Sequence, residues 1–293
     1  MTSSQTAIVV GLDGSDESRS ALTWAVENSN SNETIHIVHA FSPIAELAMA
    51  AVQQDWGPHR DRLTRALEQE WVAEARLSGA ALYTSVVDDD PVDAILSKAL
   101  TVDARMIVVG RHGSGFSRTL GSVARGLLHA LPVPVVVAVD ESARSESSTS
   151  GAVLACLGYG RAARSVQSWA SDFAGSHHRS LDLLHVVGFR PFVPLDSPSD
   201  MLGSYLGAET AIEWANTELQ DRSEEIAIDH PALSVNCRVG RGSVVKRVIE
   251  YGADASLIVL GEGHTEVITR NMFASRTLSI INGADVAVAV VPA

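Results

Sequence analysis

The sequence contains two copies of one pattern, and this internal repeat limits the folds that the chain can adopt. Residues 8–25 read IVVGLDGSDESRSALTWA and residues 153–170 read VLACLGYGRAARSVQSWA, so they align without a gap at an offset of 145. Three further pairs of segments match in the same order: Ile35–His39 with Leu181–His185, Met106–Gly110 with Leu257–Gly261, and Val133–Val139 with Val286–Val291. Four matched segments in one order indicate a duplicated structural unit.

A polar, serine-rich stretch between the copies marks the expected domain boundary. Residues 141–150 read ESARSESSTS, a composition typical of a linker. We therefore expect one domain over residues 1–146 and a second over residues 147–293. The chain of 293 residues is long enough for two domains of about 100–200 residues each.

Within each copy, short apolar runs alternate with segments of helical period. Two sets of apolar residues recur every four or every seven positions: Leu63, Leu67, Trp71 and Ala75 in the first copy, and Ile212, Leu219 and Ile226 in the second. These spacings predict amphipathic helices. Alternation of strands and helices implies right-handed crossovers, so the predicted fold class is α/β, with a doubly wound parallel sheet of five strands per copy. Ligands of such sheets bind at the carboxyl ends of the strands, where the strand order reverses.

The first candidate site follows the first predicted strand and reads Gly11-Leu12-Asp13-Gly14-Ser15. The glycines allow a tight turn, and Asp13 is left at the strand's carboxyl end, where a carboxylate can accept hydrogen bonds from a base or a ribose. The alternative is structural: Asp13 and Ser15 shape the turn and cap the next helix. The local sequence leaves both interpretations open.

The second candidate site is a glycine-rich loop over residues 109–122, VGRHGSGFSRTLGS. It follows a buried strand, and Gly121-Ser122 precedes a predicted helix, so loop amides and a helix N-terminus can together bind phosphate. Arg111 and Arg118 can add charge-assisted contacts. The alternative is an ordinary connection between a strand and a helix. No Gly-Lys-Ser/Thr element is present, which excludes a Walker-type loop.

Together these motifs resemble the universal stress protein family. The resemblance rests on Val-Gly-x-Asp-Gly-Ser near the start, a strand that ends in Val38-His39, and Gly-x-x-Gly followed by Gly-Ser late in the first copy. It extends over both copies, and therefore over essentially the whole chain.

The resemblance implies an adenine nucleotide alpha hydrolase-like fold whose domains pair through their last strands about a pseudo-twofold axis. Because many members of the family bind ATP, it also implies ATP as a ligand, with Mg²⁺ only as the companion of ATP. In that arrangement Asp13 and Val38 would contact the adenosine part. Three glycines and a serine would hold the phosphates: Gly110, Gly113, Gly121 and Ser122.

The first copy departs from the family pattern in the length of its late loop. The ATP loop of the family usually has nine residues between its second and third glycines, whereas Gly113 and Gly121 enclose seven. This length resembles the branch of the family that does not bind nucleotide. ATP binding in the first copy and a site without nucleotide therefore both stay open.

The second copy departs from the pattern at both candidate sites. Gly158 stands where Asp13 would be. In the late loop, His264 and Ala274 replace two glycines, and their β-carbons would obstruct the close approach of phosphate. Glu262 and Glu266 would repel it. We therefore predict that the second copy does not bind ATP in the family manner.

Three other features have structural interpretations. His39 and His185 occupy equivalent strand ends, where a packing or hydrogen-bonding role is expected. Cys156 replaces Gly11 in the second copy and is expected to be a small buried thiol. Asp88-Asp89-Asp90 precedes Pro91 and a predicted helix, which favours a solvated turn at a helix N-terminus over a metal site.

Composition and charge limit the partners. The net charge of −13 makes nucleic acid an unlikely general partner, because an acidic surface repels phosphate backbones. The two cysteines indicate a reducing cytoplasm. The longest apolar stretch is too short to span a bilayer, so no membrane association is expected. A homodimer and unidentified protein partners remain compatible with the sequence.

We therefore interpret the chain as a non-catalytic stress-response protein that senses or signals through a bound adenine nucleotide or a protein partner. A slow ATP hydrolase is the first alternative, but it would need a water-positioning base near the γ-phosphate. The resemblance places Asp13 at the adenosine end instead. The second alternative is a protein-binding scaffold without a nucleotide site. No catalytic or metal-ligating residues are assigned.

Overall fold

The computed structural model describes residues 6–41, 57–113, 119–140, 151–158, 160–188, 208–262 and 276–293. The chain divides into two compact units, Met1–Asp140 (unit 1) and Glu141–Ala293 (unit 2). The boundary predicted between residues 146 and 147 lies outside the described residues. The pseudo-twofold pairing of the domains stays a prediction, and each unit is described by itself.

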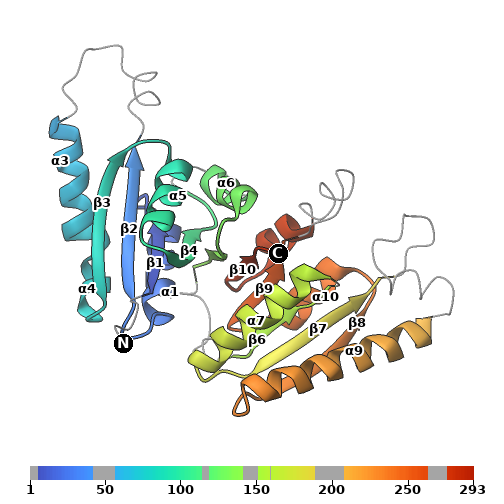
Figure 1. The fold of residues 1–293 in the computed structure, drawn as a ribbon. Coiled ribbons are helices and arrows are strands. Elements are labelled where there is room, and N and C mark those ends of the chain that lie inside the picture. Colours follow the sequence, from blue (N-terminus) through green and yellow to red (C-terminus); the bar gives the residue numbers. More distant parts are fainter. Residues whose placement is uncertain are drawn as a thin grey trace. The chain divides into compact units, whose positions relative to one another are not determined.

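Unit 1 is a doubly wound α/β domain (Figure 1). Its described strands are β1 (Ala7–Gly11), β2 (Thr34–Phe41), β3 (Ala81–Asp88), β4 (Ala104–Gly110) and β5 (Val135–Ala138). Its described helices are α1 (Asp16–Glu27), α3 (Gly57–Ala66), the π-helical turn η1 (Leu67–Trp71), α4 (Ala73–Leu77), α5 (Pro91–Thr101) and α6 (Ser122–Ala130). The strands pair in parallel in the order β3-β2-β1-β4-β5. This confirms the predicted fold class for unit 1.

The order of the strands in the sheet explains the burial of each strand. In the central strand β1, Ile8, Val9 and Val10 are completely buried, because helices cover both faces of the sheet. Right-handed crossovers place α1 with α4 on one face and α5 with α6 on the other, and both pairs of helices are in contact. The edge strand β3 is instead mostly exposed or partly buried, and Val86 is its one buried residue. Apolar burial on this scale is the main stabilising contribution to such a domain.

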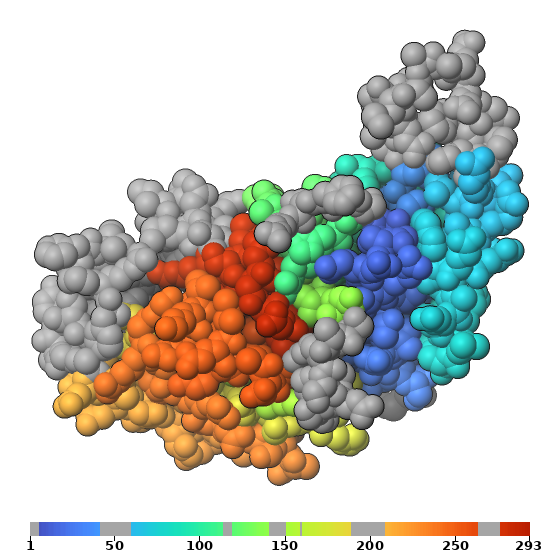
Figure 2. Space-filling model, turned by 180° about the vertical axis from the view of Figure 1, so that it is seen from behind, coloured from blue at the N-terminus to red at the C-terminus, as the bar shows by residue number. Residues whose placement is uncertain are grey.

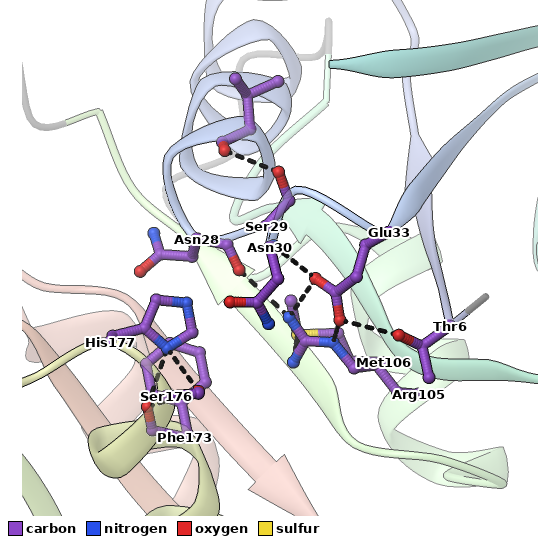
Figure 3. Close-up of polar contacts among 11 residues, drawn as sticks. Thr6, Asn28, Ser29, Asn30, Glu33, Arg105, Met106, Phe173, Ser176 and His177 are labelled. Carbon is purple, nitrogen blue, oxygen red and sulfur yellow. Dashed lines mark hydrogen bonds and ion pairs between the residues drawn. The ribbon is translucent and has the colours of Figure 1, made fainter. Parts of the chain in front are cut away.

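A buried ion pair ties the amino ends of the central strands together (Figure 3). Nη2 of Arg105 in β4 donates to the carboxylate of Glu33, which precedes β2, at 2.9 Å. The same carboxylate accepts from Thr6 Oγ1 at 3.1 Å and from the Asn30 amide at 2.8 Å. Burial alone would raise the pKa of Glu33, but the hydrogen bond to Arg105 and the other contacts hold that pKa below its usual value.

The predicted helix around Leu67 is present, but it is not one regular α-helix. It runs as α3, η1 and α4, and the Val72 amide donates to the Leu67 carbonyl at 3.3 Å, five residues back. Leu67 and Val72 are both completely buried. The extra residue in this turn places side chains that are five residues apart in the sequence on the same face of the helix. Figure 2 shows this part of unit 1 in light blue and cyan.

Unit 2 repeats the architecture of unit 1. Its described strands are β6 (Val153–Cys156), β7 (Leu181–Val187), β8 (Val235–Arg241), β9 (Leu257–Gly261) and β10 (Val288–Val291), which are parallel in the order β10-β9-β6-β7-β8. Its described helices are α7 (Arg161–Ser176), α9 (Ala208–Asp229), α10 (Val244–Gly252) and residues 276–283. The matched segments of the repeat occupy equivalent strands. The seven-residue spacing lies in α9, where Leu219 and Ile226 are buried.

Candidate functional site

The six site residues predicted from the sequence lie at one edge of the unit 1 sheet. Five of them follow or end β1 and β4, or lie at the start of α6: Asp13, Gly110, Gly113, Gly121 and Ser122. Val38 lies within β2, which continues to Phe41, so this strand does not end at Val38-His39 as predicted. From β1 the chain proceeds outward to β2 and β3, and then crosses to β4 and β5. The strand order therefore reverses between β1 and β4, and this is the position where doubly wound sheets bind ligands.

The turn after β1 is held by its own side chains. Oδ1 of Asp13 accepts hydrogen bonds from the Ser15 amide at 3.0 Å and from Ser15 Oγ at 2.5 Å. Ser15 is the N-cap of α1, and its Oγ accepts from the Ser18 amide at 3.2 Å. The structural role that the sequence offered for Asp13 and Ser15 is therefore present.

The other carboxylate oxygen of Asp13 is directed toward the loop after β4. A β-carbon added at Gly113 would lie 2.8 Å from Asp13 Oδ2. The structure thus brings together two predicted site residues that are 100 positions apart in the sequence. Glycine at this position leaves the space that the carboxylate occupies.

Gly110 and Gly121 have packing roles in the same loop. A β-carbon at Gly110 would lie 2.8 Å from the backbone carbonyl of Glu17, so glycine allows β4 to approach α1. The Gly121 amide donates to the Arg111 carbonyl at 2.9 Å. Gly121 is also the N-cap of α6, where it offers no capping side chain, and the exposed Ser122 begins the helix. Residues 114–118, including Arg118, lie outside the described residues.

Val38 is placed at the site by its backbone, not by its side chain. It pairs with Gly11 across the β1–β2 ladder, and its carbonyl accepts from the Leu12 amide at 3.0 Å. Its side chain is buried. The Val38 methyl groups are therefore not presented to a ligand at this edge.

His39 has the hydrogen-bonding role predicted from the sequence. Its Nδ1 lies 2.8 Å from the Leu12 carbonyl, and because a carbonyl only accepts, Nδ1 carries the proton and donates. His185 makes the same bond to the Leu157 carbonyl, also at 2.8 Å. Both imidazoles join the second strand of a unit to the turn after its first strand.

Two site features were not predicted from the sequence. His112 Nδ1 lies 3.2 Å from Glu17 Oε1, which ties the loop after β4 to the first turn of α1. The indole of Trp71 covers the turn after β1: a β-carbon at Gly14 would lie 2.6 Å from its Cε2 and Cζ2 atoms. The indole also lies edge-on to the His39 ring, with centroids 5.1 Å apart. No local motif signals these contacts, because each joins distant segments.

The equivalent edge of unit 2 differs in chemistry. Gly158, where unit 1 has Asp13, is exposed and supplies no carboxylate. Cys156 is a free cysteine and is partly exposed as a residue, so the predicted full burial is not observed. Desolvation nevertheless raises the pKa of its thiol to about 12. His264 and Ala274, on which the predicted loss of phosphate binding rests, lie outside the described residues.

The other predicted acidic feature is a helix cap. Asp90 is the N-cap of α5, with its carboxylate accepting from the amides of Val92 and Asp93, and Pro91 follows it. Within the described ranges, no group of three or more His, Cys, Asp or Glu side chains is placed to hold a metal ion. A search of the same residues finds no helix that is both long and apolar enough to cross a membrane.

Two tandem, doubly wound parallel α/β domains, with a glycine-rich loop at the switch point of the first, define a class of fold that binds ligands at the carboxyl ends of its strands. The sequence model of the universal stress protein family matches twice, over residues 6–139 and 151–292. The chain therefore belongs to the universal stress protein family.

Relatives of similar length align with most of the chain. A universal stress protein of Mycobacterium tuberculosis is 26% identical over 274 residues, covering 88% of this chain and 86% of the relative. One of Mycolicibacterium smegmatis is 27% identical over 307 residues, covering 97% and 96%. The crystal structure of a universal stress protein from Archaeoglobus fulgidus covers 98% of both chains with a TM-score of 0.70 and 19% identity, which supports the fold.

Proposed function

We propose that the chain is a stress-response regulator that acts by binding and not by catalysis, and that unit 1 alone binds ATP. One observation carries the proposal: Asp13, Gly113 and the start of α6 converge at the switch point of the unit 1 sheet. The adenosine part would lie by Asp13 and the end of β2. The phosphates would lie by the loop after β4.

The residues on the phosphate side are suited to an anion. Gly121 has no side chain to cap α6, so the first-turn amides of that helix are open to a phosphate oxygen. A β-carbon at Gly121 would lie 3.5 Å from the Arg111 carbonyl and 3.6 Å from the Gly113 amide. Glycine therefore keeps the backbone of the loop within reach of a ligand. Mg²⁺ would enter only with ATP, held by its phosphates.

The chemistry of the site favours binding over hydrolysis. Hydrolysis would need a base that positions water at the γ-phosphate. Asp13 lies at the proposed adenosine end and is hydrogen-bonded to Ser15. The Glu17 carboxylate is held by His112. Because both carboxylates have these structural contacts, the proposal takes ATP as a signal and not as a substrate.

A second candidate function is a protein-binding scaffold without a nucleotide site. It is favoured by the packing roles of two glycines that the ATP pattern assigns to phosphate. Gly110 lies against Glu17, and the Gly121 amide is already donated to Arg111. The loop of seven residues between Gly113 and Gly121 points the same way. In this case both units would act through protein surfaces.

Calorimetric titration of the full chain with Mg²⁺-ATP distinguishes the two functions, after a denatured sample has been checked for carried-over nucleotide. ATP binding should occur at one site per chain. Asp13→Ala should weaken it about tenfold or more, because a charged hydrogen-bond acceptor is lost. Asp61→Ala, which removes an exposed carboxylate from α3, is the matched control and should leave affinity unchanged. No binding and no carried-over nucleotide would favour the scaffold.

A further inference from the structure

Trp71 is the aromatic side chain that covers the turn of the candidate site. We propose that its indole is the base-recognition surface of unit 1, against which the planar ring of a purine nucleotide packs. The inference deepens the proposed ATP binding and rests on it. The sequence alone marked Trp71 only as one apolar position of an amphipathic helix.

The π-helical turn places this side chain beside the core instead of within it. Leu67 and Val72 are completely buried, and the bond between them spans five residues. This spacing lets both residues enter the core, and it leaves Trp71 between them, partly exposed. Single π-turns within α-helices occur frequently at functional sites, and the position of Trp71 over the turn after β1 agrees with such a role.

The contacts of the indole place it next to both residues assigned to adenosine. Gly14, on which the ring packs, follows Asp13 directly, and His39, which meets the ring edge-on, follows Val38. His39 is itself fixed by the Leu12 carbonyl. The ring is therefore held from two sides while it keeps exposed surface. A preorganised aromatic surface beside hydrogen-bonding groups is the usual means of holding a base.

The inference predicts which ligands depend on Trp71. Stacking on an aromatic ring requires a planar base, and it is tolerant of base identity because every base has a π-face. Adenine and guanine nucleotides should both depend on the ring. An inorganic triphosphate, which has no base, should not depend on it.

The test uses the full chain and two variants that keep an apolar side chain at this position. Trp71→Phe retains an aromatic face, whereas Trp71→Leu does not. Calorimetric titration with ATP should give a Kd for Trp71→Phe within about threefold of wild type, and one for Trp71→Leu at least about fivefold higher. Titration with tripolyphosphate should give the same Kd for all three proteins. Circular dichroism verifies that each variant is folded.

Fluorescence supplies a second readout that does not depend on the Leu variant. ATP should quench wild-type tryptophan emission more than tripolyphosphate does, because the base lies against the indole. The quenching should be lost in Trp71→Phe and retained in Trp169→Phe, a matched change in unit 2. If the wild type binds ATP and Trp71→Leu binds it with an unchanged or lower Kd, the inference about Trp71 is overturned but the proposed function is not. Absence of ATP binding to wild type would overturn the proposed function and the inference together.

Discussion

The contact between Gly14 and Trp71 predicts a large penalty for adding one methyl group to the turn after β1. Gly14 has φ of +82°, a left-handed conformation that costs an L-residue about 1–2 kcal/mol. The added β-carbon would also lie 2.6 Å from two atoms of the indole, and overpacking of this kind typically costs about 1–3 kcal/mol. We therefore expect Gly14→Ala to lower the free energy of unfolding by about 3 kcal/mol.

The chain offers a matched control that separates the two contributions. Gly79 has φ of +79°, but a β-carbon there would meet no atom within 4 Å. Gly79→Ala therefore carries only the backbone cost, about 1 kcal/mol. The double variant Gly14→Ala/Trp71→Leu removes the indole that the new methyl group meets. The loss in free energy of unfolding of this double variant should be about 2 kcal/mol smaller than the sum of the losses of the two single variants.

The full chain is unfolded in urea, and hydrogen exchange of peptides from β1 and β2 is the readout. This measures the free energy of unfolding of unit 1 itself. Equal losses for Gly14→Ala and Gly79→Ala would refute the reasoning, because they would show that the indole moves away without cost. An absence of coupling with Trp71→Leu would refute it in the same way. Either result would also weaken the view of Trp71 as a fixed surface.

Two further predictions concern stability away from the site. Arg105→Ala should cost about 3 kcal/mol at neutral pH, because it leaves the Glu33 carboxylate buried without its ion-pair partner. The folded pKa of Glu33 lies below its usual 4.5, so the stability that this ion pair contributes is present above pH 4.5 and is lost as the pH falls through the folded pKa. Urea unfolding over this pH range should therefore show the stabilities of the variant and the wild type converging. A difference in stability that stays constant with pH would contradict the role given to the Arg105–Glu33 pair. Asp90→Ala should lower the free energy of unfolding by about 1 kcal/mol through loss of the α5 cap, whereas Asp89→Ala should lower it much less. Equal urea midpoints for the two variants would show that Asp90 does not stabilise α5 as its cap.

The fold was predictable because its signals are local or repeated. The short apolar, β-branched runs at Ile8–Val10 and in β5 predict strands of a sheet that is covered on both faces, and both runs are completely buried. The repeat then assigned the equivalent strands of unit 2. The π-helical turn was not predictable, because Leu67 and Trp71 have a spacing of four that fits an ordinary α-helix. Only the burial of Val72 distinguishes the two.

The candidate site was predictable in its location but not in its contacts. The switch-point rule places Asp13 and Gly113 at one edge of the sheet from strand order alone. The His112–Glu17 pair joins residues 95 positions apart, and nothing in either local sequence requires it. Gly110 and Gly121 illustrate a different limit: a glycine needed for close helix packing and one needed for phosphate look the same in a sequence.

The bond that His39 and His185 make to a backbone carbonyl has a consequence for the movement of the candidate site. In each unit the imidazole Nδ1 donates to the carbonyl of the residue that follows the first strand. In unit 1 that residue is Leu12, which directly precedes Asp13. The turn that carries Asp13 is therefore held to β2, and the two cannot move independently while this bond is intact.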